Sequence, residues 1–373
     1  MSNKANIYLK DEEKITSLVC TFNQGQAEIK NKEEMIENFT RILEKNEYPH
    51  LVIFGLQECF LDVIPNLMEN KYNRIDTSSL SQNFFDTEIG FLKKKLGLGY
   101  MYLHIFVKKM EKTEDSKVLT IESMKASTDS CGSIFEKKGS IVIPIKITYG
   151  TNNTIINFVN VHLPSNPKKV TERNNCLKRS TEKLINTTFV FGDMNYRTSA
   201  IHEVPQLEQN KVEGESKNCG CETNNEYISK LKEQDQLLKE LQSDNYIKQF
   251  KEASINFCPS CRFKEYNDVK LTKENSNRCQ MISSKSVTSS KNSLYDNKRY
   301  PSWCDRILYK IKEVQNFTIE IDENSYNSEH VTMMSDHALV SLKFSIQVTL
   351  STNKSYYDKY LKYKQKYLLL KKF

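Results

Sequence analysis

The chain has 373 residues, 38% of them hydrophobic and 27% charged, and its formal net charge at pH 7 is +7. Seven lysines and one aspartate in residues 350–373 account for most of that charge, so the body of the chain is nearly neutral. This balance argues against a nucleic-acid partner, which needs a basic surface. No run of 18 apolar residues is present to span a bilayer, and the polar amino terminus does not resemble a signal peptide.

Ten cysteines are spread unevenly along the chain. In a chain of this length without a secretion signal, such usage is typical of reduced thiols in a cytosolic protein. We therefore expect a cytoplasmic protein. The length allows one large α/β domain or two domains of ordinary size.

The amino-terminal part of the chain alternates between strand and helix patterns. Residues 15–22 and 51–56 are apolar runs typical of buried strands, and residues 32–46 carry apolar side chains at helical spacing. Residues 100–107 alternate weakly and indicate a further strand. The order strand, helix, strand predicts a layered α/β fold.

Two strands joined by a turn are predicted farther along. Isoleucines at positions 141, 143, 145 and 147 alternate with other residues, and a turn at 150–153 leads to the apolar run 155–161. Pro144 suits an edge strand or a bulge better than the centre of a sheet, because proline cannot donate to the ladder. Residues 189–191 are another buried strand.

Two polar segments are predicted to be insertions. Residues 206–225 are mildly acidic, and residues 273–292 are rich in serine and lysine without periodicity. Between them, residues 228–241 carry leucines at 231, 237, 238 and 241 and are predicted to form one helix.

The carboxyl-terminal tail, residues 350–373, has a different pattern. Its tyrosines at 356, 360, 363 and 367 recur at helical spacing with lysines between them, which predicts a basic amphipathic helix. The helix is either solvated or packed on the domain, or it binds a membrane surface or a partner. There is no carboxyl-terminal cysteine box for prenylation.

A candidate site begins at Gly192, where the strand 189–191 ends. Asp193 and Asn195 stand two residues apart, so on an extended chain both side chains leave on one face. A plain turn is the alternative, because glycine, aspartate and asparagine are common turn formers. Two further stretches, residues 301–309 and 335–337, favour the site.

Polar side chains follow most of the predicted strands. In an α/β sandwich the ends of the strands meet at one rim, so these residues are expected to converge. The set is rich in hard oxygen ligands, which suit Mg²⁺ better than zinc. Its members are Asn23, Glu58, His162, Asp193, Asn195, Asp305, Asp336 and His337.

These residues lie in strings that resemble, in order, those of the inositol polyphosphate 5-phosphatase family. The string Pro-Ser-Trp-Cys-Asp-Arg-Ile-Leu at residues 301–308 is specific to that family. The string Gly-Asp-Met-Asn at residues 192–195 is of a kind shared with a wider superfamily of Mg²⁺-dependent nucleases and sphingomyelinases. The other strings are Thr-Phe-Asn, Gly-Leu-Gln-Glu, Phe-Val-Asn-Val-His-Leu and Ser-Asp-His. The resemblance covers roughly residues 15–344 apart from the insertions.

The resemblance implies a fold and a metal site. The fold is an α/β four-layer sandwich of the deoxyribonuclease I type, with two mixed or antiparallel sheets flanked by helices. Glu58, helped by Asn23, would hold Mg²⁺, and Asp336 would lie at or near the metal. Asp193 would orient or deprotonate the attacking water. We expect a monomer with a catalytic domain at residues 1–349, followed by the tail.

The resemblance also implies how the phosphate is handled. Asn195 would bind the scissile phosphate, and His162 would stabilise the transition state. His337 would contact the phosphate and be oriented by Asp305, an arrangement that fixes the tautomer of the imidazole. Arg306 resembles a structural ion-pair partner more than a catalytic group.

Short features resemble the type I enzymes, which act on soluble inositol phosphates. These features are the spacing of residues 295–300 before the Trp-Cys-Asp string, Lys-Lys-Gly at 137–139 and the string at 257–263. The implied reaction removes the 5-phosphate from inositol 1,4,5-trisphosphate and inositol 1,3,4,5-tetrakisphosphate. The alternatives are a phosphatidylinositol 4,5-bisphosphate 5-phosphatase acting at membranes and a nuclease of the same fold.

The substrate-binding residues depart from the family at one place. Lipid-acting members have a Tyr-Lys pair that grips the 4-phosphate, where this chain has Cys261 and Arg262. Arg262 keeps a phosphate-binding charge, and Arg299, Lys298 and Lys138 are expected to add further cations. The tail string Tyr-Leu-Lys-Tyr-Lys-Gln-Lys-Tyr is similar to carboxyl-terminal segments of some giant-virus proteins, which bears on source and not on chemistry.

Two other interpretations compete with this one. Cys219, Cys221, Cys258 and Cys261 together offer four thiolates to a zinc ion, although their spacing is imperfect. A binding module without activity would lack a metal-binding or water-handling residue, and the sequence lacks none of the expected set.

Overall fold

The computed structural model describes residues 3–10, 13–25, 32–60, 62–81, 100–131, 138–199, 226–263, 300–332, 335–349 and 363–364. Both predicted insertions and nearly all of the tail lie outside these ranges, so the predictions made for them stay predictions. In the described ranges, no helix is both long enough and apolar enough to cross a membrane.

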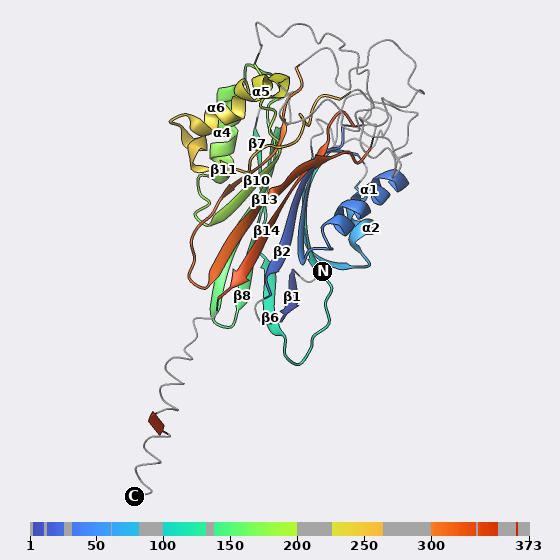
Figure 1. The fold of residues 1–373 in the computed structure, drawn as a ribbon, viewed down its shortest axis with the longest axis vertical. Coiled ribbons are helices and arrows are strands. Elements are labelled where there is room, and N and C mark those ends of the chain that lie inside the picture. The colour runs from blue at the N-terminus through green and yellow to red at the C-terminus, as the bar shows by residue number, and fades with distance from the viewer. Residues whose placement is uncertain are drawn as a thin grey trace, which may run out of the picture.

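The described chain forms two β-sheets that face each other (Figure 1). The larger sheet has eight strands in the order β1-β6-β8-β9-β10-β12-β11, with β7 beside β8. Its strands are β1 (Lys4–Leu9), β6 (Lys117–Ser123), β7 (Ser127–Cys131), β8 (Lys138–Tyr149), β9 (Asn152–His162), β10 (Thr187–Asp193), β11 (Lys251–Glu252) and β12 (Asp305–Lys310).

The smaller sheet has six strands in the order β13-β14-β2-β3-β5-β4. Its strands are β2 (Ile15–Asn23), β3 (Leu51–Cys59), β4 (Tyr72–Ser81), β5 (Tyr100–Lys108), β13 (Phe317–Glu329) and β14 (Leu339–Val348). Both sheets are mixed, because β2 runs parallel to β3 and β9 runs parallel to β10 while the other pairs are antiparallel.

Aromatic and branched side chains fill the space between the sheets. The ring of Phe189 on β10 lies 4.5 Å from that of Phe344 on β14, measured between ring centroids. Gly55 on β3 lets the sheets approach closely, because a Cβ there would lie 2.6 Å from the ring of Phe191. This buried layer fixes the relative position of the two sets of strand ends.

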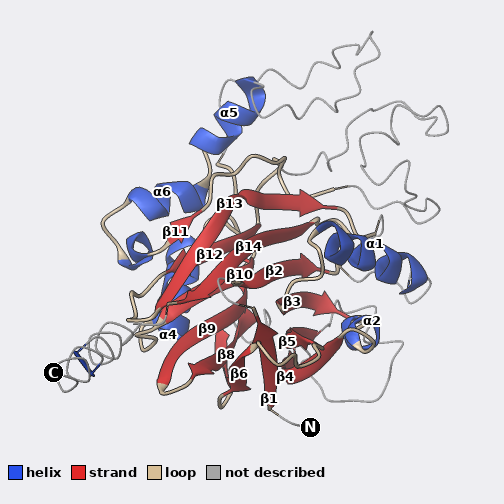
Figure 2. Cartoon of the chain, turned by 60° about the horizontal axis from the view of Figure 1, so that its bottom comes forward, coloured by secondary structure: helices blue, strands red, loops and turns tan. Residues whose placement is uncertain are grey.

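Helices cover the outer face of each sheet (Figures 1 and 2). Helices α1 (Lys32–Lys45) and α2 (Ile64–Met68) pack on the smaller sheet, where Phe39 meets Phe54 edge to face. Helix α4 (Val170–Thr181), helix α6 (Gln236–Gln242) and the 3₁₀ helix η2 (Tyr246–Gln249) pack on the larger sheet. The layers run helix, sheet, sheet, helix, which confirms the predicted four-layer sandwich.

The predicted hairpin is present as β8 and β9, which pair antiparallel through the turn at Gly150. Pro144 lies in the interior strand β8, at a one-residue register shift where residues 124–126 stand opposite residues 143 and 144, which fits the expected bulge and not an edge. It is tolerated because β6 stops pairing at Ile145 and β7 starts at Val142, so no ladder N–H is needed between them. The carbonyl oxygen of Pro144 still accepts a hydrogen bond from the N–H of Met124.

The prediction of a single helix at 228–241 is wrong. The structure has two helices, α5 (Glu226–Glu233) and α6, separated at Asp235. Asp235 caps α6 by accepting a hydrogen bond from the N–H of Leu238 at 2.8 Å. Both oxygens of its carboxylate also lie 3.0 Å from Nη1 of the buried Arg306. Residues 228–241 have a leucine spacing that favours one helix. The helix is interrupted at Asp235 because its carboxylate pairs with this guanidinium.

Arg306 is a structural ion-pair partner, as predicted. Its Nη2 lies 2.6 Å from Glu252, and its side chain is as completely buried as that of Asp235. The opposing charges of Asp235 and Glu252 outweigh the effect of burial and raise the pKa of Arg306 well above its ordinary value. The triad joins β12 to β11 and to the start of α6.

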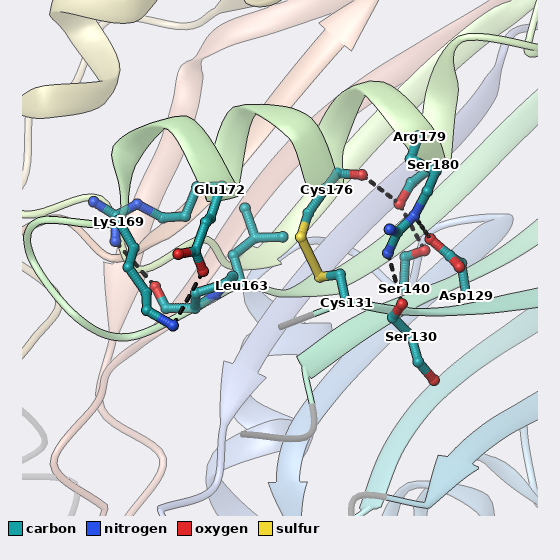
Figure 3. Close-up of a disulfide and its surroundings, with 12 residues drawn as sticks. Asp129, Ser130, Cys131, Ser140, Leu163, Lys169, Glu172, Cys176, Arg179 and Ser180 are labelled. Atoms are coloured by element: carbon teal, nitrogen blue, oxygen red, sulfur yellow. Dashed lines mark hydrogen bonds and ion pairs between the residues drawn. A yellow bond between two sulfur atoms is a disulfide. The ribbon is translucent and has the colours of Figure 1, made fainter. Parts of the chain in front are cut away.

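The prediction of reduced thiols is wrong for three cysteines. Cys131 at the end of β7 forms a disulfide with Cys176 on α4 (Figure 3), and Cys258 is also disulfide-bonded. Cys20, Cys261 and Cys304 are buried free thiols, and Cys59 is buried as well. The sequence shows the spacing of the cysteines but not that β7 lies beside α4, and this adjacency brings Cys131 to Cys176.

Replacing Arg306 by alanine is expected to lower the free energy of unfolding by about 3–5 kcal/mol, because two carboxylates would remain buried without their partner. The control is Lys248→Ala, which removes an exposed pair with Asp244 and should cost less than about 1 kcal/mol. Urea denaturation followed by circular dichroism measures both. Equal losses for the two variants would contradict the structural role of the triad.

Candidate active site

The functional side chains gather where the two sheets present strand ends at the same edge. The parallel strands β2 and β3 end near Asn23 and Glu58, and the parallel strands β9 and β10 end at His162 and Asp193. Strand β12 runs the opposite way and starts at Asp305, directly opposite Asp193. The strand-end rule therefore applies to both sheets at once.

Asp193 is the centre of the hydrogen-bond network. Its Oδ2 accepts a hydrogen bond from Nδ2 of Asn23 at 2.9 Å, and the same oxygen lies 3.3 Å from Nε2 of His162. Its Oδ1 accepts from the backbone N–H of Asn195 at 3.1 Å. Burial alone would raise the pKa of Asp193, but the hydrogen bond from His162 and the charge on His337 outweigh it and hold that pKa well below its usual range. The side chain is therefore a buried carboxylate.

Gly192 sets the register that places Asp193. Its φ is +145°, and a Cβ there would overlap the carbonyl group of Val161 on β9. Only glycine allows β10 to lie this close to β9, and the result is that Asp193 stands level with His162.

A second cluster surrounds the imidazole of His162. Its Nε2 lies 3.5 Å from Oε1 of Glu58 and 2.5 Å from Nζ of Lys138. Glu58 lies within a register shift between β3 and β5, which runs from Leu56 to Cys59, and has a left-handed backbone with φ of +48°. Burial and the charge of Lys138 lower the pKa of His162, so the imidazole is neutral near pH 7.

His337 is held by two residues of other segments. Its Nδ1 lies 2.8 Å from Oδ2 of Asp305, and the hydroxyl of Ser260 donates to the same oxygen at 2.7 Å. Burial opposes a charge on His337, but the negative charges facing it, first that of Asp305, raise its pKa well above the usual value. Oδ2 of Asp305 already accepts a hydrogen bond from Ser260, as expected of an ionised carboxylate. We therefore place the proton between Asp305 and His337 on Nδ1 of His337. The site therefore contains one neutral and one charged imidazole.

Asp336 is brought to the end of β2. Its Oδ2 lies 2.9 Å from Nε of Arg262, and its Oδ1 lies 3.9 Å from Nε2 of His337. Gly25 makes room for it, since a Cβ there would lie 2.8 Å from Oδ1 of Asp336. Ser335 fastens this loop by donating to the carbonyl oxygen of Asn23 at 2.8 Å.

Sequence reasoning missed three residues of the site, Arg197, Ser260 and Ser335. Nη2 of Arg197 donates to Oδ1 of Asn195 at 2.5 Å, and Nη1 points to Sγ of Cys261 at 3.5 Å. Arg197 stands two residues after Asn195, so the alternation that linked Asp193 to Asn195 was the signal for it. Ser335 begins the Ser-Asp-His string but was given no role of its own, and Ser260 carries no signal because serine is common in loops.

The carboxamide of Asn195 is already bonded within the protein. Its Nδ2 donates to the carbonyl oxygen of Leu163 at 3.0 Å, and its Oδ1 accepts from Arg197. The expectation that Asn195 binds the scissile phosphate stays a prediction. It would use the second hydrogen on Nδ2.

Hydrogen bonds, ion pairs and strand pairing link ten of the twelve predicted site residues around this edge. Lys298 and Arg299 are the other two, and they lie outside the described residues. The ten are Asn23, Glu58, Lys138, His162, Asp193, Asn195, Arg262, Asp305, Asp336 and His337.

The alternative of a four-thiolate zinc site loses two of its ligands. Cys258 is disulfide-bonded, and Cys261 is buried with its Sγ 3.4 Å from Nε2 of His337. Burial raises the pKa of Cys261 well above its ordinary value, so the thiol stays protonated. Cys219 and Cys221 lie outside the described residues.

The residues present fit a hard divalent cation. The carboxylates of Asp193 and Glu58 both approach Nε2 of His162, and Lys138 lies next to His162 and 3.9 Å from Glu58. Oδ1 of Asp305 is buried and has no hydrogen-bond partner among the described residues. Ligand atoms of Asp193, Asp305 and His337 lie within 4.8 Å of one another, although Asp305 and His337 already bond to each other. Oxygen donors of this kind suit Mg²⁺ or Ca²⁺.

Comparison with known proteins identifies the family. The family model described as endonuclease/exonuclease/phosphatase family 2 matches residues 20–343. The chain belongs to this family. An Arabidopsis thaliana protein named type IV inositol polyphosphate 5-phosphatase 11 is 25% identical over 311 residues, which cover 81% of this chain and 75% of the relative. Human phosphatidylinositol 3,4,5-trisphosphate 5-phosphatase 1 is 29% identical over 228 residues, 55% of this chain and 16% of that protein.

These relatives confirm the inositol polyphosphate 5-phosphatase resemblance and identify the chain as a hydrolase of that group. The chain spans three quarters of the plant relative but only a small part of the human one. What those proteins do as a whole therefore bears on this chain only as a proposal.

Solved structures support the fold. The inositol polyphosphate 5-phosphatase domain of SPsynaptojanin, in complex with inositol (1,4)-bisphosphate and a calcium ion, aligns with a TM-score of 0.53 at 17% identity, covering 99% of this chain and 94% of that one. A Cimex nitrophorin mutant aligns with a TM-score of 0.53 at 16% identity, covering 90% of this chain and 99% of that one. Two proteins with such different names share the fold, so the fold alone does not decide the function.

Replacing Gly192 by alanine is expected to lower the free energy of unfolding by about 4 kcal/mol or more, because the added methyl group overlaps the backbone of β9. Gly150→Ala is the matched control. Gly150 also has a positive φ, +57°, but its Cβ would meet nothing within 4 Å, so about 1 kcal/mol is expected. Thermal unfolding of both variants measures the difference. A small loss at Gly192 would show that β9 and β10 need not approach this closely.

Proposed function

We propose that the chain is a Mg²⁺-dependent phosphomonoesterase that removes the 5-phosphate from inositol 1,4,5-trisphosphate and inositol 1,3,4,5-tetrakisphosphate. The observation that supports this most is the buried Asp193 carboxylate between Asn23 and His162, one strand away from the Asp305–His337 pair. A carboxylate held ionised within 4.8 Å of the charged imidazole of His337 suits the attack of water on a phosphoryl group.

Asp193 is the residue that orients or deprotonates the water. Its low pKa makes it a weak base, so orientation of the water is its larger contribution. His337 contributes a positive charge at the phosphoryl oxygens, and Asp305 keeps its Nδ1 proton pointing away from them. His162 is neutral, so it takes part in this network without adding charge.

Glu58, Asn23 and Asp336 would hold the metal ion. When bound, Mg²⁺ supplies positive charge to the phosphoryl oxygens that gain negative charge in the transition state. Arg262 keeps Asp336 at the end of β2, and Lys138 stays next to Glu58 at 3.9 Å. We assign substrate phosphate binding to Lys138 and Arg262, with Lys298 and Arg299 as further candidates. We also retain residues 1–349 as the catalytic unit.

A phosphoinositide headgroup is the second candidate substrate. Several relatives carry names of lipid phosphatases, such as phosphatidylinositol 3,4,5-trisphosphate 5-phosphatase 1 and yeast polyphosphatidylinositol phosphatase INP53. The Cys261–Arg262 pair weighs against this, because Cys261 is buried against His337 and its thiol is a poor phosphate ligand. Soluble inositol phosphates therefore remain the first choice.

Phosphate release is expected from inositol 1,4,5-trisphosphate in Mg²⁺ and not in an excess of chelator. The measurement is a panel of inositol 1,4,5-trisphosphate, inositol 1,3,4,5-tetrakisphosphate, vesicles containing phosphatidylinositol 4,5-bisphosphate, and single-stranded DNA. Turnover of the vesicles alone would overturn the soluble-substrate assignment. Turnover of DNA alone would assign the chain to the nucleases of this fold.

Asp193→Asn and Asp305→Asn are each expected to lower kcat by about 10²- to 10⁴-fold, the first through the water and the second through the orientation of His337. The matched control is Asp322→Asn on β13, whose carboxylate is 48% exposed and pairs only loosely with Lys343 at 3.8 Å. It should keep kcat within about twofold of the unchanged protein. Full activity of Asp193→Asn would rule out the assigned role of Asp193.

A further inference from the structure

Strand β7 is weakly attached to the body of the protein. It has five residues and pairs only with β8, beside the main path of the sheet. Of its side chains only Cys131 is buried, and the others are exposed or half-buried. A strand with so little apolar burial depends on its ladder and on other bonds to stay in place.

Among the described residues, the side chains that bond to β7 from outside its sheet come from α4 (Figure 3). Cys131 is joined to Cys176, and Nε of Arg179 lies 2.6 Å from Oδ2 of Asp129. Arg179 also donates to the carbonyl oxygen of Ser130 at 2.6 Å. Cys176 and Arg179 stand three residues apart, so they lie on one face of the helix and both bond to β7.

The same helix also holds β8. Oγ of Ser180 lies 2.8 Å from Oγ of Ser140, one helical turn after Cys176. Cys131 pairs with Lys138 at the last position of the β7–β8 ladder, where the two strands enter the site. The disulfide therefore lies at the end of the hairpin that carries Lys138, and Nζ of Lys138 lies between His162 and Glu58.

We propose that the Cys131–Cys176 disulfide is a positioning element for Lys138, and that its redox state sets the affinity of the site for phosphorylated substrate. The proposal rests on the function proposed above. When the bond is intact, the end of β7 is fixed to α4 and Lys138 is held at the site. When it is reduced, the last ladder pair can open and Lys138 loses its fixed position.

The chemistry of the change is a thiol–disulfide exchange. A dithiol reductant attacks the sulfur–sulfur bond, and its own two sulfurs end joined to each other. Cys131 and Cys176 gain two electrons and two protons and become thiols. A dithiol would reduce the disulfide of Cys258 in the same way, so only substitution isolates the Cys131–Cys176 bond.

Removal of the disulfide is expected to raise KM for inositol 1,4,5-trisphosphate by roughly 3- to 10-fold while kcat changes less than about twofold, as fits the loss of one charge-assisted contact. The variant is Cys131→Ser combined with Cys176→Ser. Cys20→Ala is the control, because Cys20 is a buried free thiol on β2. An unchanged KM would overturn the proposal.

Removing a disulfide that only stabilises the fold would also destabilise the protein. The decisive measurement therefore combines removal of the disulfide with Lys138→Met. If the disulfide acts through Lys138, its removal raises KM in the unchanged background and has no further effect in the Lys138→Met background. Equal ratios of KM in both backgrounds would overturn the positioning role. Arg179→Gln, which removes the guanidinium that bonds to Asp129 and to Ser130 of β7, should also raise KM.

Hydrogen exchange provides a readout that needs no activity. Without the disulfide, the amides of residues 127–131 and 138–142 should exchange faster, while those of β9 stay protected. Unchanged exchange would contradict the proposed attachment. If the protein releases phosphate from no substrate but exchange changes as expected, the proposed function fails and the attachment of β7 stands.

Discussion

The hydrogen bond from Asn23 to Asp193 is the interaction on which the site depends, because it joins the ends of the two sheets. Asn23 ends β2 in the smaller sheet, and Asp193 ends β10 in the larger one. A carboxylate that is 2% exposed is costly unless donors surround it, and these donors come from segments far apart in the sequence. The packing between the sheets must therefore be exact enough to bring an amide of one sheet to a carboxylate of the other.

The two histidines of the site differ in charge because their surroundings differ. His162 faces a lysine and is buried, so it stays neutral near pH 7. His337 is equally enclosed but faces Asp305, which keeps it charged. One imidazole thus contributes a hydrogen bond and the other a charge, although the sequence presents both simply as histidines after strands.

The part of the site that the sequence predicted consists of residues at the ends of strands. Asn23, Glu58, His162 and Asp193 each follow an apolar run, and parallel neighbours must end at the same edge, so their convergence is a matter of topology. The interruption between α5 and α6 was not readable, since it comes from a guanidinium contributed by β12. The disulfide was not readable either, because it depends on β7 and α4 lying side by side. Both misses are contacts between distant segments.

Pro144 limits how far local opening of the larger sheet can extend along β8. Strands β6 and β7 are two successive neighbours of the same side of β8, and the proline stands in the gap between them. Opening that starts at the end of β7 has no continuous row of bonds to follow past this residue. Local opening that starts at the end of β7 is therefore expected to stay within the part of β8 that pairs with β7 and to leave the pairing with β6 intact.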